Sequence, residues 1–157
     1  MTKFLIELSV SVEHSDERII DSYFHVLNDL ERIGDHAENL HEIGLEMIDK
    51  RISFSDKARQ EIYEMFGNII KMFSISKTVF DSLNRDILPD LASLEENVDI
   101  QKKDLIASHF ARLTEGNCHV DVSPYFSSVV ELERVADHLV NVGYSIVNPT
   151  GSQKYTN

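Results

Sequence analysis

The spacing of apolar residues in the first third of the chain restricts the possible folds more than any other feature of the sequence. Between Asp16 and about Lys50, an apolar or small residue recurs at alternating steps of four and three positions. This spacing places these side chains along one side of a single long α-helix. The predicted buried stripe consists of Ile19, Tyr23, Val26, Leu30, Ile33, Ala37, Leu40, Gly44 and Met47.

The same helical spacing continues through the rest of the chain, and only three prolines and six glycines interrupt it. A β-rich protein of 157 residues needs more turns than this, so an all-α fold is expected. Short connections between long helices make neighbours antiparallel. The sequence therefore predicts an up-and-down helical bundle of four long helices plus a short N-terminal helix. The expected helices cover residues 1 to about 12, 16 to 50, about 56 to 84, about 87 to 114 and about 122 to 147.

The chain is strongly acidic. Its 27 Asp and Glu residues outnumber its 15 Lys and Arg residues, which gives a net charge of −12. Attraction to nucleic acid or to an anionic membrane is therefore not expected, and cations or basic protein surfaces are favoured as partners. The sequence contains no run of about 18 apolar residues, so no membrane-spanning helix is predicted. Because Cys118 has no second cysteine to pair with, a reducing, cytoplasmic location is predicted.

An internal repeat links the first long helix to the last. Residues 23–40 align with residues 125–142 at an offset of 102, without gaps, and eight of the 18 positions are identical. Such self-similarity indicates duplication of one helical unit. The repeated charged and polar residues carry the most information, because a shared apolar core would not require them. The identical pairs are Tyr23/Tyr125, Phe24/Phe126, Leu30/Leu132, Glu31/Glu133, Arg32/Arg134, Asp35/Asp137, His36/His138 and Asn39/Asn141.

Each copy of the repeat contains two carboxylates four residues apart, which lie one above the other on a helix face. Like charges at this spacing destabilise an isolated helix by roughly 0.2–0.5 kcal/mol, and a bound cation would reverse that effect. A third pair, Glu95 and Asp99, has the same spacing in the third long helix and could face one of the copies. Carboxylate oxygens suit Mg²⁺, Ca²⁺, Mn²⁺ or iron, and Zn²⁺ less well. The candidate metal ligands are Glu31, Asp35, Glu95, Asp99, Glu133 and Asp137.

Less specific interpretations stay open for the repeated polar residues. Carboxylates four residues apart are frequent on solvated helix faces, where Arg32 or Arg134 would form ordinary ion pairs with them. His36 and His138 point about 100° away from the preceding aspartates around the helix. They are expected to make cap or interhelix hydrogen bonds, with metal ligation as the alternative. The sequence has no Gly-rich phosphate loop and no Ser elbow, and its motif lacks the Glu-x-x-His pair of di-metal enzymes, so no enzymatic function is predicted.

The sequence Leu-Glu-Arg-Ile-Gly-Asp-His-Ala at residues 30–37, with its second copy at residues 132–138, resembles the PhoU family of phosphate-signalling proteins. The stretches at residues 95–99, 109–113 and 116–118 are most similar to the PhoU-like C-terminal cytoplasmic domain of bacterial sodium/phosphate cotransporters. The resemblance implies two spectrin-like three-helix repeats, each binding a metal cluster, often of iron or zinc. It also implies that Glu31 and Asp35 are ligands in the first repeat, and that Glu95 and Asp99 join Glu133 and Asp137 in the second.

The resemblance further implies a division of the chain and a role. Residues 1–50 would form a truncated first repeat, residues 51–148 a complete second repeat, and residues 149–157 a disordered tail. The expected role is regulation of phosphate transport or signalling through contacts with a phosphate transporter or its membrane domain. A location at the inner face of the membrane follows if the chain belongs to a longer transporter. A metal-free helical dimerisation or docking module is the alternative.

A homodimer is expected for two reasons. The first repeat lacks the helices that would complete it, and a second subunit could supply them. Several apolar residues also widen the apolar faces of the helices beyond one stripe, although burial within one bundle explains them equally well. These residues are Ile20, Phe24, Met72, Phe73 and Phe80.

Overall fold

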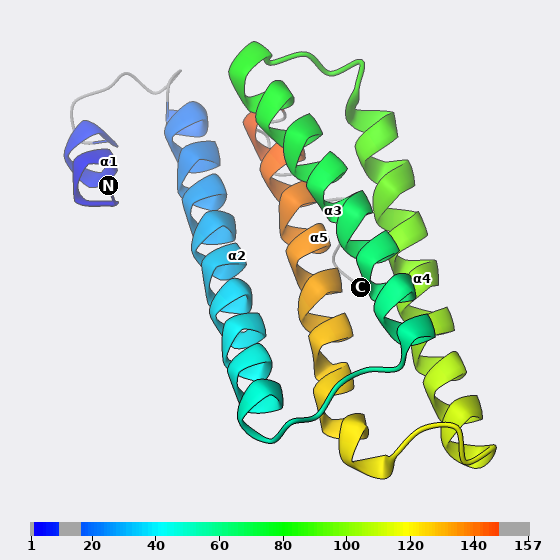
Figure 1. Ribbon diagram of the computed structural model, residues 1–157. Coiled ribbons are helices and arrows are strands. Elements are labelled where there is room, and N and C mark those ends of the chain that lie inside the picture. The colour runs from blue at the N-terminus through cyan, green and yellow to red at the C-terminus, as the bar shows by residue number, and fades with distance from the viewer. Residues whose placement is uncertain (1, 10–16, 148–157) are drawn as a thin grey trace.

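The computed structural model describes residues 2–9 and 17–147, and within these ranges it contains helices and no β-strand. The all-α fold is therefore confirmed. Long helices that follow one another in the chain run in opposite directions, as the colour gradient in Figure 1 shows, so α3 and α5 are parallel to each other. The predicted tail at residues 149–157 lies outside the described residues. The helices are α1 (Thr2–Ser9), α2 (Glu17–Asp49), α3 (Asp56–Ser82), α4 (Leu88–Thr114), the 3-10 helix η1 (Val120–Phe126) and α5 (Ser127–Val147).

Local signals in the sequence set most of the helix ends. Ser55 caps the start of α3, where its hydroxyl oxygen accepts a hydrogen bond of 3.3 Å from the backbone N–H of Ala58. Pro89 lies in the first turn of α4, where backbone N–H groups have no intrahelical acceptor, so a proline there costs no hydrogen bond. Gly116 follows the end of α4 with a positive φ of 72°, a conformation that glycine adopts without steric cost.

The predicted start of the last helix at about Val122 is wrong. Residues Val120–Phe126 form the 3-10 helix η1, and the α-helix begins only at Ser127. Pro124 explains the difference, because a proline has no N–H to donate to the residue four positions before it and disfavours α-helical geometry in the residue that precedes it. The shorter α5 still contains the whole carboxylate motif of the second repeat.

Three helices, α3, α4 and α5, enclose the main apolar core. Gly143 marks a close contact within it, because a Cβ atom built there would lie 2.7 Å from Cδ2 of Leu91. Helix α2 packs mainly against α5, on the side away from α4 (Figure 1). The core side chains with no exposed surface are Met65, Met72, Val79, Leu91, Val98, Val129 and Ala136.

The predicted apolar stripe on α2 is only partly correct. Val26 is buried, and Ile33 and Leu40 pack against the core. In contrast, Tyr23 is 39% exposed and Leu30 is 46% exposed. Because α5 covers only one side of α2, the polar side chains of Asp29 and His36 are more buried than Tyr23 and Leu30 of the predicted stripe.

Those polar residues form a reciprocal network between α2 and α5. Oδ1 of Asp29 accepts hydrogen bonds from Nδ1 of His138 at 2.8 Å and from Nδ2 of Asn141 at 3.4 Å. The network repeats at the offset of 102, so that Oε2 of Glu131 accepts from Nδ1 of His36 at 2.7 Å and from Nδ2 of Asn39 at 2.9 Å. The two imidazole rings stack on each other with centroids 5.5 Å apart. The prediction of interhelix hydrogen bonds for both histidines is confirmed.

We predict that Asp29→Ala lowers the free energy of unfolding by about 1–3 kcal/mol, because His138 and Asn141 lose their shared acceptor at a partly buried interface. Urea titration followed by circular dichroism measures this change. Asp21→Ala is the matched control on the same helix, since the side chain of Asp21 is 69% exposed, and a change within about 0.5 kcal/mol is expected. Equal losses in the two variants would contradict a stabilising role for the network.

Candidate metal centre

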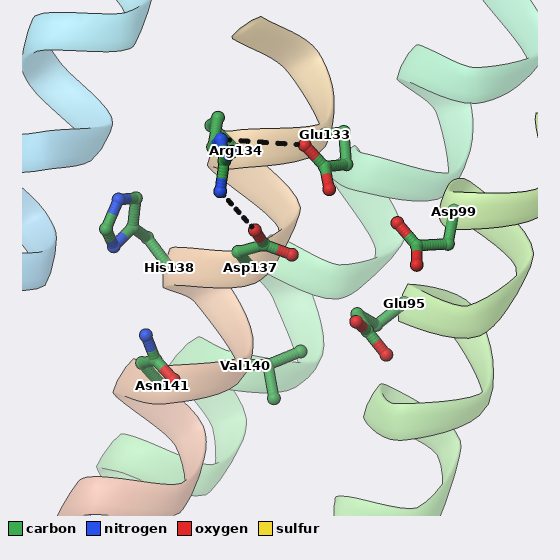
Figure 2. A pocket seen from close by; sticks show the side chains of 8 residues that line it. All are labelled: Glu95, Asp99, Glu133, Arg134, Asp137, His138, Val140 and Asn141. Atoms are coloured by element: carbon green, nitrogen blue, oxygen red, sulfur yellow. Dashed lines mark ion pairs between the residues drawn. The ribbon is translucent and has the colours of Figure 1, made fainter. Parts of the chain in front are cut away.

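A cleft of about 410 Å³ opens between α4 and α5, and four of the six predicted ligands line it. Glu95 and Asp99 extend from α4, and Glu133 and Asp137 extend from α5 toward them (Figure 2). We call these four residues the acidic cleft. The antiparallel packing of two helices that each carry carboxylates four residues apart brings the two pairs together.

Glu133 is the most buried member of the acidic cleft, with 6% of its surface exposed. Its Oε1 accepts a hydrogen bond of 2.6 Å from Nζ of Lys102. Its Oε2 is buried and accepts no hydrogen bond. Nε of Arg134 lies 3.8 Å from this oxygen, beyond hydrogen-bonding distance. A buried carboxylate oxygen without a partner is costly, so a ligand that contacts Oε2 would stabilise the site.

The carboxylates of the acidic cleft also disfavour one another's ionisation. Burial, followed by the charges of Asp99, Asp137 and Glu133, raises the pKa of Glu95. Burial and the charge of Glu133 likewise raise the pKa of Asp137, and Arg134 opposes this effect only in part. The local excess of negative charge therefore makes the cleft attractive to a cation.

Two basic side chains partly balance this charge. Arg134 lies 3.5 Å from Oδ2 of Asp137, which confirms the ordinary ion pair considered from the sequence (Figure 2). Lys102 contacts both Glu133 and, at 3.7 Å, Asp99. The sequence interpretation missed Lys102, although its position three residues after Asp99 places it on the same helix face. With every group ionised, two basic side chains face four carboxylates, which leaves two negative charges unbalanced.

The first copy of the motif lies in a different environment. Glu31 and Asp35 are both exposed. The side chain of Asp35 is 57% exposed, and its Oδ2 lies 3.9 Å from Nη1 of Arg32. The structure does not bring them near the other four predicted ligands. Glu31 is exposed because α5 packs on another side of α2.

The four carboxylates of the acidic cleft are not arranged as a complete metal coordination shell. Within residues 2–9 and 17–147, no group of three or more His, Cys, Asp or Glu side chains is placed to hold a metal ion. The donor types nevertheless fit a hard cation, because all four are carboxylates and one buried oxygen is free. Side-chain rotation would therefore have to accompany binding.

His109 does not line the acidic cleft. It is buried against η1, where its ring stacks on Phe126 with centroids 3.8 Å apart and its Nε2 lies 3.0 Å from the hydroxyl of Ser123. Its Nδ1 is 3.9 Å from Sγ of Cys118. These contacts hold the turn after α4 against the bundle and explain both residues as structural.

Comparison with known proteins places these observations in a family. The model of the PhoU domain matches residues 62–146, which is more than half of the chain. The phosphate-specific transport system accessory protein PhoU homolog 1 of Thermotoga maritima is 26% identical over 155 residues, which cover 90% of this chain and 66% of that protein. The chain thus spans just under two thirds of the length of this relative. No solved structure matched significantly. The extent of the PhoU domain match shows that the chain belongs to the PhoU domain family.

Proposed function

We propose that this protein is a non-enzymatic, metal-binding regulatory domain that modulates phosphate transport or phosphate signalling through contacts with other proteins. Membership of the PhoU domain family and the name of the Thermotoga maritima relative, an accessory protein of phosphate transport, support the regulatory role. The buried, unpartnered Oε2 of Glu133 supports the metal-binding role. The proposed ligands are Glu95, Asp99, Glu133 and Asp137.

A bound divalent cation would supply the two positive charges that the acidic cleft lacks. It would also join α4 to α5, because each helix contributes two of the four carboxylates. Binding to the folded state alone would raise the stability of the bundle with metal concentration. The oxygen-only donor set favours iron, Mn²⁺, Mg²⁺ or Ca²⁺ over Zn²⁺.

We predict that purified protein binds Mn²⁺ and that Glu133→Ala/Asp137→Ala weakens binding more than about 100-fold, a loss larger than that typical of an outer-shell change. Isothermal titration calorimetry measures the affinity, and elemental analysis identifies metal retained from the cell. Glu31→Ala/Asp35→Ala is the matched control, because it removes the same two charges from the exposed copy of the motif. Absence of metal binding in the unmodified protein would refute the metal-binding role.

We predict that Asp137→Asn raises the melting temperature of the metal-free protein at neutral pH. Because the pKa of Asp137 is raised in the folded state, its ionisation opposes folding as pH rises above the ordinary value of 3.8. The gain should therefore shrink as pH falls toward that value, and differential scanning calorimetry at several pH values measures it. A variant that is less stable than the unmodified protein at neutral pH would show that the charge of Asp137 is well compensated.

The proposed protein contacts have a candidate surface on α2 and α3. Phe66, Phe73 and Phe80 recur every seven residues along one side of α3 and are 47%, 53% and 38% exposed. The rings of Phe80 and of Tyr23 on α2 meet edge to face, with centroids 6.2 Å apart, so an exposed aromatic residue of each helix meets the other at this point. We call Ile19, Tyr23, Leu30, Phe66, Phe73 and Phe80 the α2–α3 apolar surface. Among the residues predicted for a dimer interface, Ile20 and Met72 are instead buried in the chain itself.

The repeat supports a second copy of the chain as the partner of the α2–α3 apolar surface. Leu132 of α5 is 6% exposed because α3 and α4 pack on its side of the helix, whereas its equivalent on α2, Leu30, is 46% exposed. Helix α2 thus retains an apolar face that a helix pair covers in the other repeat. A second copy of the chain, contributing its own α2–α3 apolar surface, would bury these residues in a symmetric homodimer. This surface also supports the alternative role of a metal-free docking module.

We predict that the unmodified protein elutes with about twice its chain mass of 18.0 kDa, and that Phe73→Asp converts it to a monomer by placing a charge in the interface. Size-exclusion chromatography with light scattering measures the mass. Phe110→Asp is the control, since Phe110 is 63% exposed on α4, away from the α2–α3 apolar surface. A monomeric unmodified protein would exclude the homodimer, and a partner protein would then be the occupant to seek.

A more specific setting is also part of the proposal. The sequence at residues 95–99, 109–113 and 116–118 supports a role as the cytoplasmic domain of a sodium/phosphate cotransporter, acting at the inner face of the membrane. None of the described helices is long and apolar enough to cross a bilayer.

A further inference from the structure

We infer that Lys102 is a built-in counter-ion of the acidic cleft that an incoming cation must displace, so that this lysine sets the affinity for metal. The inference rests on the proposed metal-binding function and assigns to Lys102 a part that the carboxylate motif does not predict. Lys102 is not a ligand; it competes with the metal for the same oxygens.

The position of Lys102 follows from helix geometry. It lies three residues after Asp99 and seven after Glu95, so all three side chains share one face of α4. From this face its ammonium group reaches α5 and donates a hydrogen bond of 2.6 Å to Oε1 of Glu133, while lying 3.7 Å from Oδ1 of Asp99. One ammonium group therefore joins the same two helices that the four carboxylates would join through a metal.

The contacts of Lys102 explain why the acidic cleft is not arranged as a coordination shell. The hydrogen bond engages one oxygen of Glu133 and leaves the other, Oε2, buried without a partner. An ammonium group on one oxygen of Glu133 would repel a cation that approached the same carboxylate. A single positive charge also compensates the cleft incompletely, since burial and the charges of neighbouring carboxylates still raise the pKa of Glu95.

The ammonium group of Lys102 can move away from Glu133 when a cation binds. Arg134 does not replace it as a hydrogen-bond donor to Glu133. The side chain of Lys102 is 23% exposed and sits on a flexible four-carbon stem, so its ammonium group can move to solvent and recover hydration. Arg134 is 56% exposed and lies 3.8 Å from Oε2 of Glu133, too far for a hydrogen bond. A divalent cation would bring twice the charge of the ammonium group into contact with both oxygens.

The test measures Mn²⁺ binding to the full chain by isothermal titration calorimetry for the unmodified protein, Lys102→Met and Lys103→Met. Lys103 is the matched control, because it is the next residue, carries the same charge and is exposed. We expect Lys102→Met to tighten Mn²⁺ binding about tenfold or more, and Lys103→Met to change it less than about twofold. Thermal unfolding without metal should show a lower melting temperature for Lys102→Met only, because Glu133 then loses its partner.

Lys102→Gln guards against a failure to fold, since its amide can still donate a hydrogen bond to Glu133 without carrying a charge. It should also bind Mn²⁺ more tightly than the unmodified protein. Equal or weaker binding by both Lys102 variants, beside clear binding by the unmodified protein, would overturn the inference and leave the proposed function intact. Binding by the Lys102 variants alone would support the inference and refute metal binding by the native chain. Absence of binding in every protein would overturn both.

Discussion

The packing of α5 against helices on two sides is the interaction on which the rest of the structure depends. One side of α5 buries Val129, Leu132 and Ala136 against α3 and α4, and the other meets α2 through the hydrogen-bond network of Asp29 and Glu131. A helix with two covered sides has little surface left for solvent. Glu133 and Asp137 lie at the edge of the covered region, which is why their charges are partly buried and poorly compensated.

The bundle itself could be predicted from the sequence, because four long amphipathic segments with short connections allow few other arrangements. The helix ends at Ser55 and Gly116 followed from local capping residues. The buried side of α2 could not be predicted in the same way. Its apolar face is wider than one partner helix covers, and only the position of α5 decides that Val26 is buried while Leu30 is exposed.

The grouping of the four carboxylates in the acidic cleft was predictable, whereas the basic side chain that contacts them across the two helices was not. The spacing of Glu95 and Asp99 matched that of Glu133 and Asp137, and antiparallel packing brought the two pairs together. The sequence did not reveal that Lys102 reaches across to Glu133, because that contact depends on the register between α4 and α5. The exposure of Glu31 and Asp35 likewise depends on which side of α2 has a partner. Identical motifs thus differ in electrostatic environment according to the helices beside them.

The network between α2 and α5 has a consequence for the origin of the fold. Each helix donates through a histidine and an asparagine and accepts through a carboxylate, and the two sets are related by the offset of 102. With the two imidazole rings stacked at its centre, this interface has the self-complementary form that two identical chains make across a twofold axis. An ancestor with one copy of the unit could have formed the same contacts as a dimer. Duplication and fusion would then have turned a concentration-dependent association into a permanent internal contact, and freed the two copies to diverge.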